Sequence, residues 1–155
     1  VAAGAGASIA LMGDITVAAR SASLSFLFAP KLGLCPDMGA THFLARRIGE
    51  ARARAFALTG APITAEEAAR IGLIAECVDD DRLMARALEL AEGLAAGPRE
   101  AFLAVRELMA SACTSSLADQ LEREASAQGR LADSPDFLEG VMAFREKRPA
   151  KFGRR

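Results

Sequence analysis

The chain has 155 residues, of which 52% are hydrophobic, and a formal net charge of −1 at pH 7. This length and composition can supply a hydrophobic core, while the balanced charge gives no electrostatic basis for binding nucleic acid or an anionic membrane. No apolar run approaches the length of a transmembrane helix. The three cysteines are scattered, and we expect reduced, buried thiols of a cytoplasmic protein at Cys35, Cys77 and Cys113.

The first half of the chain is expected to mix short strands with helices. Glycines, prolines and the spacing of apolar residues divide it into segments. Thr64, with Glu67 three residues later, forms a capping-box pattern that predicts a helix start at Ala65. In chain order we expect a helix at Ala7–Gly13, strands at Ile15–Ala18 and Ser23–Phe28, helices at Ala40–Ile48, Glu50–Leu58 and Ala65–Gly72, and a strand at Leu73–Val78.

The second half is expected to contain helices only. Pro98 suits the first position of a helix, and Ser116 and Ser134 suit N-cap positions. The expected helices are Arg82–Ala95, Pro98–Ala112, a helix from Ser116 to about Leu131 and a last one from Ser134 to about Lys147. The pattern therefore predicts an α/β region followed by an all-helical region.

The stretch Lys31–Phe43 combines a rigid turn, a carboxylate and small residues that lead into a helix. Pro36 fixes its own backbone and favours an extended Cys35, so the chain enters Asp37 in a defined direction. Two interpretations of Asp37 remain open. Its carboxylate can cap the following helix by accepting backbone N–H bonds, or it can take part in chemistry. The charged residues from Arg46 to Arg54 are expected to form a solvated face.

The stretch Val1–Asp14 is a small-residue loop that runs into a short apolar helix. Gly4 and Gly6 permit unusual backbone angles, so amide N–H groups at the helix start can face a ligand oxygen. Glycines of this kind also serve simple close packing. The dinucleotide-binding fingerprint is excluded, because its glycine spacing fails at Ile9 and no strand precedes the loop.

Several blocks of sequence follow one another along the chain: VAAGAGASIALMGDITVAARSA at Val1–Ala22, KLGLCPDMGATHFLARRIG at Lys31–Gly49, LTGAPITAEEAARIGLIAECV at Leu58–Val78, and the closing SPDFLEGVMAF and KRPAKFGR. Together they resemble the crotonase superfamily, the enoyl-CoA hydratase/isomerase family, over essentially the whole chain. The strings AARSA and GLCPDMGAT are most similar to the phenylacetate-type enoyl-CoA and epoxide isomerase branch, although Ser23–Lys31 carries one residue more than that branch.

The resemblance implies the crotonase-like α/β fold, a spiral of ββα units. Residues 1–78 would form the C-terminal part of its core, and residues 79–155 a helical trimerisation region. Family members carry another half before this point, and the chain opens without Met on what resembles the end of a buried strand. We therefore expect a C-terminal fragment, which the preceding half would complete with further strands and one more oxyanion-hole N–H.

The resemblance also implies the chemistry of the site. Family members bind an acyl-CoA thioester and hold its carbonyl oxygen between two backbone N–H groups, which favour the enolate as it forms. The matching donor here is the N–H of Ala5, with Gly4 and Gly6 beside it in the substrate-binding loop. Coenzyme A is part of the substrate, and no further cofactor is expected. A single histidine, His42, and scattered cysteines give no metal site.

Acid–base residues separate the activities within the family. Hydratases use two glutamates, whose positions correspond here to Ser8 and to Ala29, or to Phe28 if the alignment shifts by one residue. None of these side chains exchanges a proton at neutral pH, which argues against simple hydratase activity. Isomerase branches place an aspartate at the position of Asp37, where it faces the acyl chain and moves a proton between carbons. Burial would raise the pKa of that aspartate and improve it as a base.

The resemblance thus implies an acyl-CoA isomerase that shifts a double bond, or opens a ring epoxide, with Asp37 as acid and base. Two alternatives stay open. One is an enoyl-CoA hydratase, and the other is a catalytically inactive crotonase-like subunit. Adding the preceding half would separate them, because only a latent enzyme would gain acyl-CoA turnover.

The helical tail carries two further expectations. Phe144 and Lys147 are three residues apart on one side of the last predicted helix, and the resemblance implies contact with the adenine and phosphate end of CoA. A packed Phe beside a solvated Lys is the alternative. The apolar face at Leu117, Leu121 and Ala125 can pack on the chain's own core or on a neighbouring subunit. The resemblance implies a homotrimer or a pair of trimers.

Overall fold

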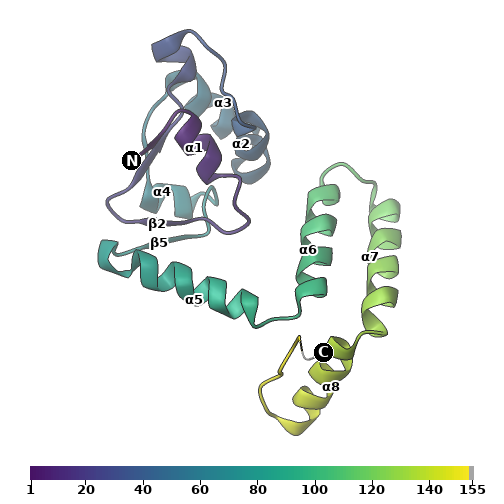
Figure 1. Cartoon of the computed structure of the whole chain (residues 1–155). Coiled ribbons are helices and arrows are strands. Elements are labelled where there is room, and N and C mark those ends of the chain that lie inside the picture. Colours follow the sequence, from purple (N-terminus) through teal and green to yellow (C-terminus); the bar gives the residue numbers. More distant parts are fainter. Residues whose placement is uncertain (154–155) are drawn as a thin grey trace. The chain divides into compact units, whose positions relative to one another are not determined.

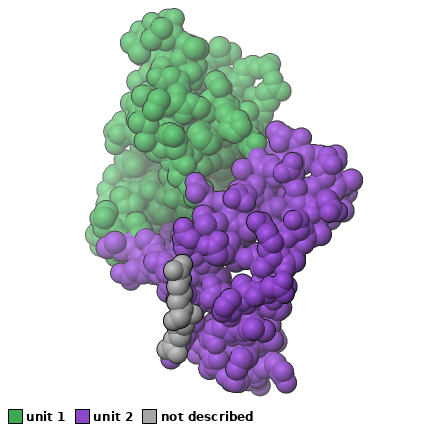
Figure 2. All heavy atoms as spheres, turned by 45° about the vertical axis from the view of Figure 1, so that its right-hand side comes forward, with its two compact units in different colours: residues 1–87 green, residues 88–155 purple. Residues whose placement is uncertain are grey.

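The computed structural model describes residues 1–153, and the chain divides into two compact units, Val1–Ala87 and Leu88–Arg155 (Figure 2). Each unit is built differently. The first contains five short strands and several helices, whereas the second contains helices only within its described residues. The mixed-to-helical order follows the sequence pattern, and the division falls inside helix α5 (Leu83–Ala95), nine residues after the boundary expected between residues 78 and 79.

The first sheet of the first unit contains β1 (Ala2–Ala3), β3 (Ser23–Ser25) and β4 (Ile63–Thr64). β1 pairs with β3 in parallel, and β3 pairs with β4 in antiparallel orientation, so β3 is the central strand. Buried Ser25 donates its hydroxyl to the carbonyl of Gly60 at 2.9 Å, just before β4. This bond gives the one buried polar side chain of β3 a partner, as burial requires.

A second, two-stranded parallel sheet joins β2 (Val17–Ala19) to β5 (Glu76–Val78), seen side by side in Figure 1. Arg20, which follows β2, donates to Asp79 at 2.9 Å and also pairs with Glu66. The backbone N–H of Ser21 donates to the Asp80 carboxylate at 3.0 Å. Polar side chains therefore hold the ends of this short pair, which is too short to be stable by itself.

Four helices surround the core of the first unit: α1 (Ala5–Ala10), α2 (Ala40–Ile48), α3 (Glu50–Thr59) and α4 (Ala65–Arg70). Their inward faces and the strands bury one cluster of apolar side chains. Its largest fully buried members come from the C-cap of α1, the residue after β3, α2, β4 and the segment after α4: Leu11, Phe26, Leu44, Ile63 and Leu73. Burial of side chains of this size contributes about 1.5–3 kcal/mol each to folding.

The predicted strand Ser23–Phe28 stops at Ser25, and the chain then enters a π-helix at Phe28–Leu32. Pro30 lies inside this turn and has no N–H to offer a sheet. Backbone bonds from Lys31 to Leu27 and from Leu34 to Phe28, at 3.1 and 3.2 Å, close the wide turn instead. A π-turn takes up an extra residue per turn compared with an α-helix, and this one overlaps the end of Ser23–Lys31.

The segment Leu73–Val78 was also predicted as a strand throughout, and only Glu76–Val78 is one. Gly72 takes a left-handed conformation after α4, with φ 78°. The N–H groups of Leu73 and Ile74 then return to the carbonyl of Ala68, at 2.8 and 3.2 Å. These two apolar residues therefore finish a helix and fill the core, so their burial does not reflect strand pairing.

The second unit contains α6 (Arg99–Ala112), α7 (Leu117–Ala132) and α8 (Pro135–Glu146) after α5. Figure 1 shows α6 and α7 side by side as a helical hairpin. The Gln120 side chain crosses between them and donates to the carbonyl of Leu108 at 3.1 Å. Ser116 and Ser134 cap α7 and α8 as predicted, each accepting a backbone N–H at 3.1 Å.

The burial of the cysteines and the position of Pro98 differ from the sequence predictions. All three thiols are free, as expected, but Cys35 and Cys113 are exposed rather than buried, and Cys77 is half-buried. Pro98 is the N-cap of α6, one position before the predicted site. No described helix is long and apolar enough to cross a membrane.

Candidate active site

Asp37 lies in a strained turn before α2. Met38, directly after it, has φ 50°, and Gly39 has φ 78°, so two consecutive residues adopt the left-handed conformation. The N–H of Ala40 donates to the backbone carbonyl of Asp37 at 2.9 Å, which closes the turn. A left-handed non-glycine residue costs free energy and is concentrated at functional sites. The strain at Met38 is a signal that the sequence pattern did not reveal.

Of the two interpretations of Asp37, the one in which its carboxylate caps the helix is wrong. Gly39 is the N-cap of α2, and no side chain makes the capping hydrogen bond. The Asp37 carboxylate is exposed and makes no hydrogen bond or ion pair with any residue in the described range 1–153. The Asp37 side chain is therefore not buried by the residues that the structure describes. The turn therefore presents a carboxylate that has no hydrogen-bond or ion-pair partner among the described residues.

The Gly-rich loop presents backbone donors at the start of α1. Gly4 adopts φ 55° and ψ −129°, and its own N–H donates to the carbonyl of Ser25 at 2.9 Å. The N–H groups of Ala5 and Gly6 have no acceptor within residues 1–153. The first N–H groups of a helix lack intrahelical partners and favour negative charge. The loop thus anchors Gly4 to β3 and leaves the N–H of Ala5 available to a ligand oxygen.

The two loop glycines differ in what they require. Gly4 needs its positive φ, and a Cβ there would approach the ring of Phe28 at 3.9 Å. A Cβ at Gly6 would meet nothing within 4 Å, and Gly6 is exposed. The structure therefore explains the glycine at position 4 by conformation, whereas it shows no packing reason for the glycine at position 6.

The resemblance aligned the hydratase glutamates with Ser8 and with Ala29 or its neighbour Phe28. Ser8 lies in α1, and Phe28 and Ala29 lie in the π-helix. Ser8 is fully buried, and its hydroxyl donates to the carbonyl of Gly4 at 3.3 Å. Ala29 is half-buried. Ser8 therefore acts as a small packing residue that ties the first turn of α1 to the Gly-rich loop.

The expectation that the charged residues from Arg46 to Arg54 form a solvated face is wrong for Arg47. Its guanidinium donates to the carbonyls of Leu11 at 2.7 Å, Gly13 at 3.0 Å and Leu73 at 3.1 Å. It also lies over the ring of Phe43, 5.7 Å from the centroid. Burial lowers the pKa of the Arg47 guanidinium, and the charge of Asp14 opposes that shift. Arg46 is the preceding residue of the same helix, so only the tertiary structure distinguishes the two arginines.

Phe144 lines a groove of about 840 Å³ in the second unit. The groove lies between the start of α6, the end of α7, α8 and the segment after α8, and its surface is mainly apolar. Phe144 itself is 86% exposed. The alternative of a Phe packed into its own chain is therefore not what the structure shows.

Lys147 lies just beyond α8 and not within it. It is the C-cap of the helix and adopts a left-handed conformation with φ 53°. The expectation that Phe144 and Lys147 share one helical face is wrong for this reason. Both side chains are nevertheless exposed, and the N–H of Lys147 donates to the carbonyl of Phe144 at 3.3 Å.

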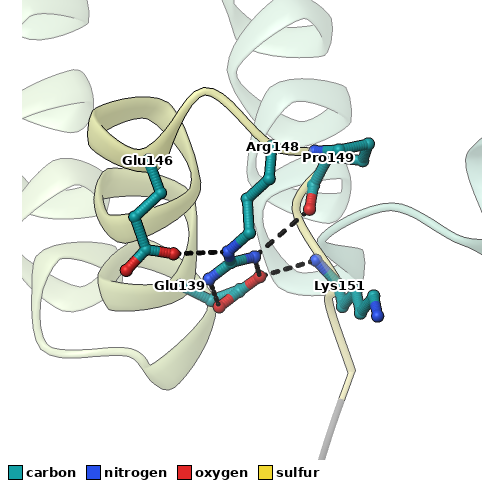
Figure 3. Close-up of polar contacts among 5 residues, drawn as sticks. All are labelled: Glu139, Glu146, Arg148, Pro149 and Lys151. Atoms are coloured by element: carbon teal, nitrogen blue, oxygen red, sulfur yellow. Dashed lines mark hydrogen bonds and ion pairs between the residues drawn. The ribbon is translucent and has the colours of Figure 1, made fainter.

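The segment after Lys147 is fastened to α8 by Arg148 (Figure 3). The guanidinium pairs with both oxygens of Glu139, at 2.6 and 3.0 Å, and with Glu146 at 2.6 Å. These carboxylates raise the pKa of Arg148 above its ordinary value. The N–H of Lys151 also donates to Glu139, at 2.8 Å. Arg148 thereby fixes the backbone beside Lys147.

The described residues contain no group of three His, Cys, Asp or Glu side chains placed to hold a metal ion. His42 is exposed on α2 and makes an edge contact with the Phe43 ring, with 5.5 Å between centroids. The first unit thus carries the open carboxylate of Asp37 before α2 and the open N–H of Ala5 at the start of α1. α1 and α2 contact each other within the first unit.

Known proteins resemble this chain along essentially its whole length. The family described as enoyl-CoA hydratase/isomerase matches residues 1–155. A Rhodobacter capsulatus protein named a probable enoyl-CoA hydratase is 47% identical over 151 residues, covering 97% of this chain and 58% of the relative. The 1,2-epoxyphenylacetyl-CoA isomerase of Escherichia coli is 45% identical over 152 residues, covering 98% of this chain and 58% of the relative.

Solved structures give the same result. The crystal structure of an enoyl-CoA hydratase from Bacillus anthracis superimposes with a TM-score of 0.91 at 34% identity, covering 97% of this chain and 58% of that one. The α/β crotonase fold expected from the sequence is thus confirmed. The chain spans 58% of the length of the curated relatives reported above. It belongs to the enoyl-CoA hydratase/isomerase family.

Proposed function

We propose that this chain forms part of an acyl-CoA isomerase in which Asp37 moves a proton between carbons of an unsaturated acyl-CoA. One observation carries the proposal. Asp37 is an exposed carboxylate without a partner in the described chain, and a turn with two left-handed residues presents it. The positions where hydratases keep two glutamates hold Ser8 and Ala29 instead, neither of which can exchange a proton.

The proposed reaction needs one base and one oxyanion donor. Asp37 removes a C–H proton made acidic by the conjugated thioester, and the electron pair spreads onto the thioester oxygen. The N–H of Ala5 donates to that oxygen, with a second N–H from the remainder of the family domain. Protonated Asp37 returns a proton to a different carbon, so the double bond moves and no water is added. Gly4 and Gly6 line the loop that receives the thioester.

The acyl group is proposed to resemble that of the isomerase relative. The 1,2-epoxyphenylacetyl-CoA isomerase of Escherichia coli is 45% identical to this chain, so ring epoxides of aryl-acetyl-CoA and simple enoyl-CoA esters are the first substrates to try. Phe144 and Lys147 are proposed to contact the adenine and phosphate end of CoA. The protein is proposed to assemble as a homotrimer or a pair of trimers through its helical region.

Hydration is the second candidate, because the Rhodobacter capsulatus relative at 47% identity is named as a hydratase. The products separate the two reactions. An isomerase leaves the mass of the acyl-CoA unchanged in H₂¹⁸O, whereas a hydratase adds one labelled water across the double bond. Mass spectrometry of the acyl-CoA product, formed by the full-length protein that contains this chain, decides between them.

The proposal is tested by Asp37→Asn in the same full-length protein. Loss of a general base commonly lowers a rate by about 10²–10⁴-fold, so we expect kcat for isomerisation to fall by at least the lower factor. CoA-ester binding should persist, because the amide keeps the shape of the side chain. Asp81→Asn is the matched control, since Asp81 is an exposed carboxylate in the short helical turn before α5. A fully active Asp37→Asn protein would refute the proposal.

A further inference from the structure

Arg47 is placed to control α1 from the end opposite the proposed oxyanion donor. Its guanidinium leaves α2 and reaches the carbonyl of Leu11, the C-cap of α1, at 2.7 Å, and that of Gly13 at 3.0 Å. A third bond, of 3.1 Å, reaches the carbonyl of Leu73 after α4. One side chain thus joins three segments that are far apart in the sequence.

Helix α1 needs such external support. It spans only six residues, Ala5–Ala10, and helices this short are not stable alone. The last carbonyls of any helix lack intrahelical donors. Here the hydroxyl of Thr16 donates to the carbonyl of Ala10 at 2.9 Å, and Arg47 serves the carbonyls beyond it. A cation at this end also interacts favourably with the helix dipole.

The other end of α1 is the proposed site. The N–H of Gly4 is bonded to the carbonyl of Ser25 in β3 at 2.9 Å, while the N–H of Ala5 stays open toward a ligand. The direction of that open N–H follows the axis of α1, because backbone N–H groups of an α-helix point along its axis. The loop fixes one point of the axis, and Arg47 with Thr16 fixes the other.

We propose that Arg47 is a positioning residue that aims the N–H of Ala5 at the substrate thioester oxygen. This inference rests on the proposed function, since it assumes an acyl-CoA whose carbonyl is held at the start of α1. Arg47 touches neither substrate nor reacting atoms. It acts by holding α1 at the angle at which the hydrogen bond to the developing oxyanion is best formed.

Lysine cannot replace Arg47 in this role. An ammonium group presents its donors from one nitrogen, whereas the guanidinium presents donors from separate nitrogens in a fixed plane. Here two different nitrogens of Arg47 serve three carbonyls. Arg47→Lys therefore keeps the charge and most of the volume but loses the simultaneous contacts. The variant should alter the direction of α1 while keeping a half-buried cation at this position.

The test compares Arg47→Lys with the parent in the full-length protein that contains this chain. A misaligned catalytic group typically costs up to about 100-fold in rate, so we expect kcat to fall by about 10- to 100-fold with KM changed little. The second readout is the C=O stretching frequency of a bound enoyl-CoA labelled with ¹³C at the thioester carbonyl. Its downward shift on binding should become smaller, because the hydrogen bond to the oxygen weakens.

Arg86→Lys is the matched control. Arg86 pairs with both oxygens of Glu76, at 2.7 and 2.8 Å, and joins β5 to α5. Its replacement also costs stability, but the kcat and the C=O frequency should match those of the parent. If Arg47→Lys does not fold, Thr16→Val removes the 2.9 Å bond to Ala10 and should give smaller changes in the same direction.

The outcomes separate the two proposals. Suppose that the parent turns over substrate and shifts the C=O frequency, and that a folded Arg47→Lys protein does both equally well. This result overturns only the proposed role of Arg47. The same holds if only Thr16→Val folds and matches the parent. A parent that neither turns over an acyl-CoA nor shifts its C=O frequency overturns the proposed function and this inference together.

Discussion

Gly60 is a position where the structure distinguishes backbone strain from side-chain overlap. Gly60 and Gly33 both adopt left-handed conformations, with φ 62° and 64°. A Cβ at Gly60 would lie 2.7 Å from Cγ of Pro30, whereas a Cβ at Gly33 would meet nothing within 4 Å. The two sites therefore differ in steric surroundings but not in backbone angle.

We predict that Gly33→Ala lowers the free energy of unfolding by about 1–2 kcal/mol, the cost of a left-handed alanine. Gly60→Ala should cost about 1–3 kcal/mol more, because the methyl group also displaces Pro30 and the π-helix. Urea unfolding of both variants measures the difference. Equal losses would show that the π-helix yields freely to the added methyl group.

Lys147 provides a prediction about binding. If its ammonium group meets the phosphates of CoA, Lys147→Ala should raise KM for CoA esters and leave kcat nearly unchanged, the mark of lost uniform binding. Lys151→Ala is the control, since Lys151 is also exposed on the same segment. Steady-state kinetics of the full-length protein measures both parameters. An unaltered KM for Lys147→Ala would remove Lys147 from the proposed site.

Individual residues were predicted unevenly from the sequence. Asp37 and the N–H of Ala5 were predicted as site groups from their positions within family-like motifs. The structure leaves both without partners in the described chain. The exposure of Asp37 and the three backbone contacts of Arg47 were not predicted. Both depend on which segments meet in three dimensions, and the sequence around Arg46 and Arg47 shows two equivalent charges.

At the scale of elements, Glu76 and Arg86 join β5 to α5 through a bidentate pair, with bonds of 2.7 and 2.8 Å. The hydrogen bonds from Arg86 lower the pKa of Glu76. A carboxylate whose pKa is lowered on folding stabilises the protein above its unfolded pKa, and this contribution is lost as the pH falls through the folded pKa. The ordinary pKa of glutamate is about 4.3.

We therefore predict that Glu76→Gln weakens the pH dependence of stability below about pH 4.3. At pH 7 the parent should be more stable than the variant, and the difference should shrink as the solution is acidified. Urea unfolding at pH 7 and at several lower values measures this. A difference that is constant with pH would mean that the pair contributes no charge-dependent stability.

Helices were easier to predict than strands. The start of α2, α3, α4 and α8 follows local capping or breaking residues, and these starts agree with the structure. The strands are only two or three residues long. Their length depends on pairing with distant segments, so alternation within Ser23–Phe28 could not show that pairing ends at Ser25.

For the whole molecule, the second unit leaves large apolar side chains uncovered. Leu117 and Leu121 on α7 are 76% and 56% exposed, and Ala125 is exposed as well. This face therefore does not pack within the second unit. Uncovered apolar faces of this kind mark interaction surfaces, which supports the proposed assembly of subunits through the helical region.

We predict that Leu121→Asp in the full-length protein reduces the assembly, because a buried carboxylate without a partner is costly at an apolar interface. Arg123→Asp is the control, since position 123 lies about 200° around α7 from position 121. Light scattering after size-exclusion chromatography gives the molecular mass of each. A Leu121→Asp protein with the mass of the parent would show that this face is not the contact between subunits.

The turn at Met38 has a consequence for engineering. A methionine held at φ 50° keeps free energy stored in the native backbone, so selection for thermal tolerance alone would favour glycine or asparagine there. The same replacement would let the preceding carboxylate sample more directions. A substitution at Met38 that raises heat resistance would then lower turnover. Consensus-based stabilisation should therefore leave Met38 unchanged.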